Sequence, residues 1–299
     1  MATVSIVLPV YNRDLELRRA LTSAQRQSYA DFECLVVYED SPIDTATIVA
    51  DYGDARFRCI RGEARSGPAA ARRSGFAQVS GDYVLALDSD WELYPWALDQ
   101  GVRRFASNPT VDVVCALHLH NEDSRLFARV AGSERVITPT EFRELEPAPD
   151  RVAMVRRNVT DEWLAIPGDY FALESGLWIT TELSHSSLAL DEPWVRYHTA
   201  SADRLTTGLK TEGGRTHRLR DCSTFLDKRQ DLIDCGPCIS VDRMLEEMYF
   251  DLTRAKHPYA AKAAAALVSR GVRPQSAFMR QTSMRARRRL GRPPSVHWV

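Results

Sequence analysis

Two carboxylates stand directly after a strand-like run. Residues Tyr83 to Leu87 form a continuous apolar run, and Asp88-Ser89-Asp90 follows it at once. A buried strand that ends in this way places oxygen ligands at the C-terminal edge of a sheet, where open α/β sheets bind ligands. Such oxygens suit Mg²⁺ or Mn²⁺, and an ion held by one or two carboxylates takes its other ligands from phosphate and water. The pattern therefore indicates metal-assisted phosphate chemistry, with a solvated turn as the alternative.

Three more strand-like runs are followed by polar or glycine-containing segments. Parallel strands bring their carboxyl ends to one edge, so segments that follow such strands are expected side by side. A polar residue after one strand is common, but the same feature after four strands favours a ligand site. The other three segments are Pro9-Val10-Tyr11-Asn12, Glu39-Asp40 and Gly67 to Arg72.

The elements that must position these segments alternate between strand and helix. Short apolar, β-branched runs alternate with stretches of helical spacing, which predicts an α/β fold with a mostly parallel sheet flanked by helices. Asn12 is a predicted cap for the first helix. The predicted strands are 4–8, 32–37, 56–60, 83–87 and 111–117, and the predicted helices are 13–28, 45–52, 67–79 and 95–106.

The second half of the chain is less regular. Residues 121–162 are charged and interrupted by proline, which predicts an irregular excursion, and residues 178–181 resemble a return strand. The pattern is polar from Asp203 until Ser240, where the first of two helices is predicted; Pro258 opens the second and Gly271 ends it. The arginine-rich segment 280–299 is expected to be flexible. We expect a nucleotide-binding half (1–120), an acceptor-binding half (121–235) and a helical appendage with a basic tail (236–299).

Size and composition exclude several classes of protein. The 299 residues are 44% hydrophobic and can bury the core of one large domain or two small ones. A net charge of -1 gives no general attraction to nucleic acid. No run approaches the roughly 18 apolar residues of a spanning helix, and the N-terminus lacks a signal core. We therefore expect a cytoplasmic protein with reduced cysteines and no transmembrane segment. Peripheral membrane contact through the basic tail stays open.

Three segments in combination resemble glycosyltransferase family 2. The resemblance covers roughly residues 3 to 205 and implies a GT-A fold, a Rossmann-like sheet flanked by helices, here followed by a helical C-terminal appendage. It also implies a nucleotide-sugar donor and an inverting reaction. The matching segments are Ser5-Ile6-Val7-Leu8-Pro9-Val10-Tyr11-Asn12, Gly67-x-x-x-Ala71-Arg72 and Leu87-Asp88-Ser89-Asp90.

The resemblance implies where the nucleoside binds. Pro9, Val10 and Tyr11 would form the floor against which the base and ribose lie. Glu39 stands where the family usually has Asp, and would accept an N–H of the base. A carboxylate can pair with uracil or guanine, so its type does not identify the base. A UDP-sugar is favoured on family frequency, with guanosine and thymidine donors open.

The resemblance also implies where the diphosphate and the metal bind. Arg72 would reach the base or the diphosphate. Asp88 would contact the ribose or the metal, and Asp90 would hold Mn²⁺ or Mg²⁺ against the diphosphate. The family often has another Asp at the next position, where this chain has Trp91. That departure removes a carboxylate and offers an aromatic surface for a sugar.

The catalytic base of the family matches the segment around Asp203. A hydroxyl acceptor is a weak nucleophile, so a carboxylate must take its proton as the glycosidic bond forms. Asp203 is assigned that role by resemblance, although Ala202 replaces the usual Glu, and Asp191 is the main rival. The bound ion would neutralise the leaving diphosphate, and the sugar would pass through an oxocarbenium-like state.

Two other functions remain as alternatives. A sugar nucleotidyltransferase would have a glycine-rich phosphate loop after the first strand, where this chain has Pro9-Val10-Tyr11-Asn12. A non-catalytic sugar-nucleotide-binding protein would not need the carboxylates Asp88, Asp90 and Asp203. The acceptor is left open among a saccharide, a natural product, a peptide and a lipid-linked sugar.

Two further sets of residues give weaker signals. Cys235-Gly236-Pro237-Cys238 resembles a thioredoxin-type dithiol, but it lacks the strand-to-helix context that lowers a thiol pKa. With Cys222 and His217 it could instead complete a zinc site, and an inert loop is the favoured interpretation. Trp178 and Trp194 are candidates for lining an acceptor site, although aromatic side chains are more often core residues.

Overall fold

The computed structural model describes residues 3–39, 42–62, 67–120, 126–127, 134–145, 152–166, 175–198 and 212–289. The strands are β1 (Val4–Val10), β2 (Phe32–Tyr38), β3 (Phe57–Arg61), β4 (Tyr83–Ala86), β5 (Trp91–Leu93), β6 (Val113–His120), β7 (Leu126–Phe127), β8 (Arg135–Ile137), β9 (Val152–Arg156) and β10 (Ser187–Tyr197). The helices are α1 (Asp14–Gln25), α2 (Thr45–Ala50), α3 (Pro68–Phe76), α4 (Ala97–Ser107), α5 (Pro139–Phe142), α6 (Arg157–Ala165), α7 (Ser175–Ser184), α9 (Glu212–Lys228), α10 (Gln230–Ile233), α11 (Ile239–Arg254), α12 (Ala260–Ser269) and α13 (Pro274–Arg289).

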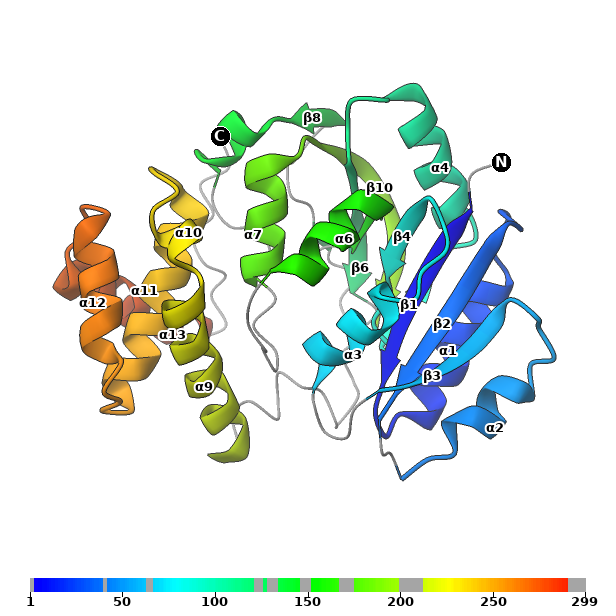
Figure 1. The fold of residues 1–299 in the computed structure, drawn as a ribbon, viewed down its shortest axis with the longest axis horizontal. Coiled ribbons are helices and arrows are strands. Elements are labelled where there is room, and N and C mark those ends of the chain that lie inside the picture. The colour runs from blue at the N-terminus through cyan, green and yellow to red at the C-terminus, as the bar shows by residue number, and fades with distance from the viewer. Residues whose placement is uncertain are drawn as a thin grey trace.

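The strands form one mostly parallel sheet in the order β3-β2-β1-β4-β9-β6-β10-β5, with helices on both faces (Figure 1). The strands β1, β2, β3 and β4 are parallel to one another. Strand β9 runs antiparallel between β4 and β6, and β10 is parallel to β6. The carboxyl ends of β1, β2, β4 and β10 therefore lie at one edge, which we call the carboxyl edge. The predicted α/β class is confirmed.

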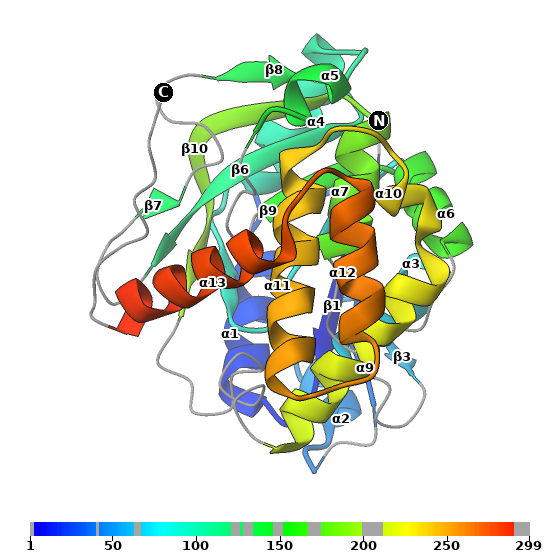
Figure 2. The same cartoon turned by 90° about the vertical axis from the view of Figure 1, so that its left-hand side faces the viewer.

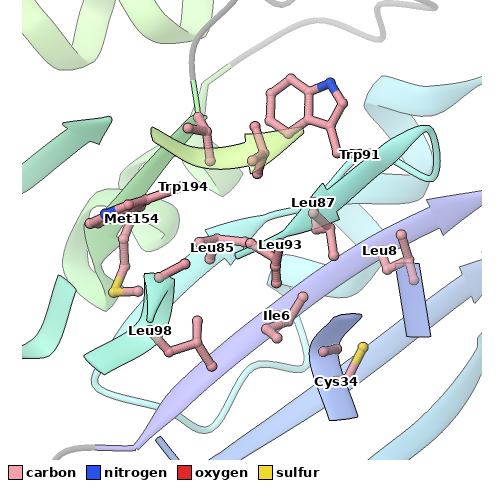
Figure 3. Packing of buried hydrophobic residues seen from close by; sticks show 14 of the residues in the cluster. Ile6, Leu8, Cys34, Leu85, Leu87, Trp91, Leu93, Leu98, Met154 and Trp194 are labelled. Carbon is pink, nitrogen blue, oxygen red and sulfur yellow. The ribbon is translucent and has the colours of Figure 1, made fainter. Parts of the chain in front are cut away.

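Strand β1 shows why the two faces carry different helices. Successive side chains of a strand point to opposite faces. Ile6 and Leu8 lie in the core formed with α1, α2 and α4, and Figure 3 shows both among the packed apolar side chains of that core. Val7, by contrast, packs with residues of α3 and α6 on the opposite face.

Helix α3 approaches the sheet unusually closely at Gly75. A Cβ added there would lie 2.4 Å from Val7 Cγ1 and 3.0 Å from Val37 Cγ2. Glycine is therefore required at this contact because any side chain would push the helix off β1 and β2. The close packing fixes the helix that carries Arg72.

Two parts of the second half differ from the prediction. The interval 121–162 contains β9, a buried strand in the middle of the sheet, and the first six residues of α6. Its four apolar residues are flanked by charged ones, and the pairing that fixes it comes from β4 and β6, far away in the chain. Residues 178–181 form part of α7 instead of a return strand. The hydroxyls of Thr180 and Thr181 donate to the carbonyls of Gly176 and Leu177, which satisfies them within a helix.

The C-terminal helices form a group that packs on α7 and β10 (Figures 1 and 2). A helix, α9, occupies part of the segment described as polar from sequence; it buries Cys222, Phe225 and Leu226. The expected flexible tail is wrong for residues 280–289, because α13 continues through them. There, Arg280 pairs with the buried Glu246, and Arg285 with Asp251 at 2.7 Å. No helix in the described ranges is both long and apolar enough to span a bilayer.

Candidate active site

The segment after β1 leads from the buried sheet to an exposed ring. Pro9 and Val10 are buried, whereas Tyr11 is 46% exposed. The carbonyl of Val7 accepts the last hydrogen bond from the β4 side, donated by the N–H of Leu87. The backbone nitrogen of Pro9 faces the same side but lies beyond this last hydrogen bond. The missing N–H of Pro9 therefore costs the sheet no hydrogen bond. The predicted cap is wrong: Arg13 is the N-cap of α1, and Asn12 has a left-handed φ of 49°.

Arg13 links this segment to the acidic motif. Its Nη1 donates to Asp90 Oδ2 at 3.0 Å and to Ser89 Oγ at 3.2 Å. Both ion-pair partners are buried, with about a tenth of each side chain exposed. Burial, and next the negative charge of Asp88, raise the pKa of Asp90, while Arg13 opposes them. Arg13 was not among the residues predicted for the site, although it follows the matched segment directly.

Arg72 lies beside Asp88. The guanidinium Nη2 of Arg72 forms an ion pair with Asp88 Oδ1. Arg72 lies in α3 and Asp88 follows β4, so the contact joins two elements that the sequence analysis treated separately. Each carboxylate of the acidic motif thus has its own arginine partner.

Glu39 anchors the start of α3. Its Oε1 accepts a hydrogen bond from the backbone N–H of Gly67 at 2.9 Å, and the residue is only 5% exposed. Gly67 is the N-cap of α3 and has a φ of 89°, which favours glycine. The carboxylate therefore interacts with a helix N-terminus, whose unpaired N–H groups favour negative charge.

A histidine that was not predicted adjoins the acidic motif. The backbone N–H of His198 donates to the carbonyl of Asp90 at 3.0 Å. Its Nε2 lies 2.9 Å from Glu92 Oε2. His198 follows β10, and Glu92 lies in the paired strand β5, so the histidine marks the carboxyl end of β10 next to that of β4. Only the pairing of β10, which the sequence did not predict, brings it there.

Trp91 and Trp194 do not offer the surfaces that were predicted. Trp91 is 6% exposed and stacks on His118 with ring centroids 6.3 Å apart. Trp194 is fully buried and donates from Nε1 to Gln100 Oε1 at 2.9 Å. Figure 3 shows both within the apolar packing. Trp178 is half-buried and packs edge-on against Trp163. Trp91 and Trp194 are therefore core residues.

The predicted base, Asp203, lies outside the described residues. Its rival Asp191 is exposed within β10, six residues before Tyr197 at the strand's carboxyl end. At about 3.3 Å per residue, Asp191 lies roughly 20 Å along the strand from that end. Asp191 therefore lies away from the carboxyl edge.

The acidic motif fits a divalent ion, whereas the described residues do not assemble the alternative zinc site. Asp88 and Asp90 supply adjacent hard oxygen ligands, a set that suits Mg²⁺ or Mn²⁺ once phosphate and water complete the coordination. Across the described ranges, no group of three or more His, Cys, Asp and Glu side chains is arranged to hold a metal by itself. The structure therefore does not support the alternative zinc site on His217, Cys222, Cys235 and Cys238, all of which are described.

Comparison with known proteins identifies the family of the first half. The model of the family described as "Glycosyl transferase family 2" matches residues 5–164. The chain is 34% identical over 87 residues to "UDP-Glc:alpha-D-GlcNAc-diphosphoundecaprenol beta-1,3-glucosyltransferase WfgD" of Escherichia coli. The matched segment covers 29% of this chain and 34% of that protein. The first curated relatives are matched over about a third to two fifths of their length.

Two solved structures are similar in fold. S. aureus TarS 1-349 in complex with UDP-GlcNAc superposes with a TM-score of 0.60 and 17% identity, covering 89% of this chain and 79% of that one. The mannosyltransferase PcManGT from Pyrobaculum calidifontis, in complex with GDP-Man and Mn2+, superposes with a TM-score of 0.56 and 20% identity, covering 95% and 80%. The expected GT-A fold is confirmed.

Proposed function

Because this chain belongs to glycosyltransferase family 2, we propose that it transfers a sugar from a nucleoside-diphosphate sugar to a hydroxyl acceptor, with inversion at the anomeric carbon. The observation that carries the proposal is the meeting of two arginines with two carboxylates at the carboxyl edge. A donor diphosphate needs cationic partners, and a divalent ion needs carboxylates. This edge contains both.

The described residues have distinct roles in donor binding. The exposed ring of Tyr11 supports the base, with Pro9 and Val10 forming the floor beneath it. Glu39 accepts an N–H of the base while its anchored position holds the start of α3. We favour a UDP-sugar, since the fold neighbour TarS holds UDP-GlcNAc; GDP-Man in the other neighbour keeps a guanosine donor as the alternative.

The acidic motif, through the ion it would bind, and its two arginine partners would neutralise the negative charge of the diphosphate. Asp90, supported by Asp88, would hold Mn²⁺ or Mg²⁺, and when bound the ion supplies positive charge beside the leaving group. Arg13 and Arg72 can exchange their carboxylate partners for phosphate oxygens, because a guanidinium pairs well with either.

Asp203 is the proposed general base. It would take the proton of the acceptor hydroxyl as the oxygen attacks the anomeric carbon opposite the diphosphate. One direct displacement inverts the centre and needs no covalent sugar–enzyme intermediate. We assign residues 1–120 to donor binding, 121–235 to acceptor binding and 236–299 to a helical appendage. A saccharide, natural product, peptide or lipid-linked sugar fits this chemistry as the acceptor.

A thermal-shift screen of nucleoside diphosphates with and without Mn²⁺ or Mg²⁺ tests donor binding. UDP with metal is expected to raise Tm more than UDP alone, and more than the other diphosphates with metal. If no diphosphate changes Tm, donor binding is contradicted. Asp203→Asn should abolish transfer while keeping the diphosphate shift. A non-catalytic binding protein would show the shift but no transfer with wild type.

A further inference from the structure

A second reactive cluster lies at the start of α11, in the segment Cys235-Gly236-Pro237-Cys238. The carbonyl of Cys235 accepts from Arg143 Nη1 at 2.7 Å, and Arg143 directly follows α5. Helix α5 is preceded by β8, which pairs with the first residues of β10, Ser187 to Ala189. The segment therefore lies toward the amino end of β10, away from the carboxyl edge, and takes no part in the proposed transfer.

The chain geometry brings the two thiols together. Gly236 has a φ of 81°, a left-handed conformation that turns the chain between the two cysteines. Cys238 is the N-cap of α11, a helix of 16 residues. Hydrogen bonding between the two side chains is the largest influence on the pKa of each thiol. Two intervening residues with a turn at Gly236 give a spacing that allows an intramolecular disulfide to close.

The two cysteines differ in access. Cys235 is half-buried, whereas Cys238 is only 2% exposed. Arg270 holds the more accessible sulfur: its Nη1 lies 3.8 Å from Cys235 Sγ, and its Nη2 donates to the carbonyl of Gly236 at 2.8 Å. One thiol thus faces incoming reagents beside a fixed cation, and the other is shielded behind it.

The same contacts make the two thiols differ in acidity. The hydrogen bond from Cys238, followed by the charge of Arg270 and then that of Arg143, lowers the pKa of Cys235 to about 6, against the effect of burial. That hydrogen bond and burial raise the pKa of Cys238 above its ordinary value. The strand-to-helix context that the sequence seemed to lack is replaced by a turn, a helix start and two arginines.

We infer that Cys235 and Cys238 form a reversible dithiol–disulfide pair that exchanges with disulfides, in which Cys235 attacks and Cys238 resolves. The reaction partner is a disulfide R–S–S–R of low molecular weight. The inference does not rest on the proposed glycosyl transfer, because the cluster shares no described contact with Arg13, Arg72, Asp88 or Asp90.

The exchange balances in two steps. The Cys235 thiolate attacks one sulfur of R–S–S–R, so that a mixed disulfide forms and one R–S⁻ leaves. Cys238 then loses its proton and attacks Cys235 Sγ, which releases the second R–S⁻ and closes the internal disulfide. Two protein thiols are oxidised and one external disulfide is reduced to two thiols. Excess external thiol reverses both steps.

Another cysteine provides a matched control. Cys59 in β3 is also half-buried, but burial raises its pKa. It should therefore remain a thiol at neutral pH and react slowly. Serine substitution at Cys59 tests whether any effect is specific to the pair.

The test uses the full chain with glutathione disulfide, followed by acid quenching, alkylation and peptide mass spectrometry. Wild type and Cys59→Ser should both yield an internal disulfide between residues 235 and 238 that dithiothreitol reverses. Cys238→Ser should stop at a glutathione adduct on Cys235, and Cys235→Ser should leave residue 238 unmodified. An absent internal disulfide in wild type, or an adduct on Cys238 in place of Cys235, would overturn the inference.

The rate of alkylation by iodoacetamide as a function of pH supplies an independent readout. In Cys238→Ala the contact between the two thiols is lost, so the midpoint for Cys235 should rise above the wild-type value near pH 6. In wild type, alkylation of Cys59 should still increase above pH 9. A wild-type Cys235 profile that coincides with that of Cys59 would contradict the assigned attacking role, whether or not glycosyl transfer is observed.

Discussion

Arg13 Nη1 donates to Asp90 Oδ2 at 3.0 Å, so a guanidinium is paired with the carboxylate that a divalent ion would need as a ligand. Both side chains are largely buried, and Ser89 Oγ accepts a second bond from the same nitrogen. An ion that binds Asp90 in the absence of donor must compete with this contact. A donor diphosphate can remove the competition by giving Arg13 an alternative partner. Metal and donor are therefore expected to bind cooperatively.

Removal of the Arg13 charge should change metal and donor binding in opposite directions. Arg13→Gln frees Asp90, so we expect the donor-free Kd for Mn²⁺ to fall by about fivefold, equivalent to about 1 kcal/mol. Donor hydrolysis should decrease because the diphosphate loses a cationic partner. Calorimetric Mn²⁺ titration and a nucleoside diphosphate release assay measure the two effects.

Arg18→Gln is the control for that substitution. Arg18 lies on the same helix, and its ion pair with Asp14 is half-exposed, so its loss should change neither quantity. If Arg13→Gln binds Mn²⁺ more weakly than wild type, Arg13 does not compete with the ion.

Glu39 should separate anchoring from recognition. Glu39→Gln keeps an oxygen that can accept the Gly67 N–H, so the free energy of unfolding should stay within about 1 kcal/mol of wild type. Its affinity for the nucleoside diphosphate should fall by about tenfold, since the charged acceptor for the base is lost. Glu39→Ala leaves the buried N–H unpaired and should destabilise the fold by about 1–3 kcal/mol. Urea denaturation and diphosphate titration distinguish these outcomes; unchanged diphosphate affinity in Glu39→Gln would remove the recognition role.

Gly75 should be intolerant of even a methyl group. Gly75→Ala places a Cβ against Val7, and we expect a loss of about 1–3 kcal/mol in the free energy of unfolding. Gly213→Ala is the matched control, because an added Cβ at that helical glycine would meet nothing within 4 Å apart from its chain neighbours and its own helix backbone; it should stabilise by up to about 1 kcal/mol. Equal effects of the two substitutions in urea denaturation would contradict the close approach of α3 to the sheet.

His185 should make stability depend on pH. Its Nδ1 lies 2.9 Å from Asp112 Oδ2 and its Nε2 lies 2.8 Å from Glu162 Oε2, while Arg156 also pairs with Asp112 at 3.5 Å. Burial disfavours the imidazolium, but the bonds to Glu162 and Asp112 together raise the pKa of His185 above 6.5. The stabilisation is thus full below pH 6.5 and is lost as pH rises through the folded-state pKa.

The variant His185→Gln should accordingly be less stable than wild type by about 1–3 kcal/mol near pH 6, with a smaller difference at pH 9. Denaturant titrations at the two pH values measure it. A difference that grows between pH 6 and pH 9 would contradict the charged contact.

The local part of the site could be predicted from sequence, because its segments follow strands of the sheet in the chain. Asp88 and Arg72 were both identified, yet their ion pair depends on how α3 packs on β1. Strand β9 and the histidine after β10 were missed because strand pairing across long stretches of chain fixes them. Arg13 was missed because helical spacing assigned it to α1 before any contact with Asp90 was visible.

The surroundings of the cysteine segment also could not be predicted from the local sequence. The spacing of Cys235 and Cys238 was visible, but the cations beside them come from Arg143 and Arg270. Those residues are 92 and 35 positions from Cys235 in the chain. No local pattern contains that information, so the acidity of Cys235 follows only from the fold.

Release of nucleoside diphosphate from a panel of UDP- and GDP-sugars, with Mn²⁺ and without acceptor, tests the central claim most directly. Wild type should release the diphosphate slowly, and both EDTA and Asp90→Asn should reduce that rate by at least about 100-fold, or about 2.7 kcal/mol. Asp99→Asn, which alters an exposed pair with Arg103 on α4, should match wild type. Release that persists undiminished in Asp90→Asn and in EDTA would contradict the account.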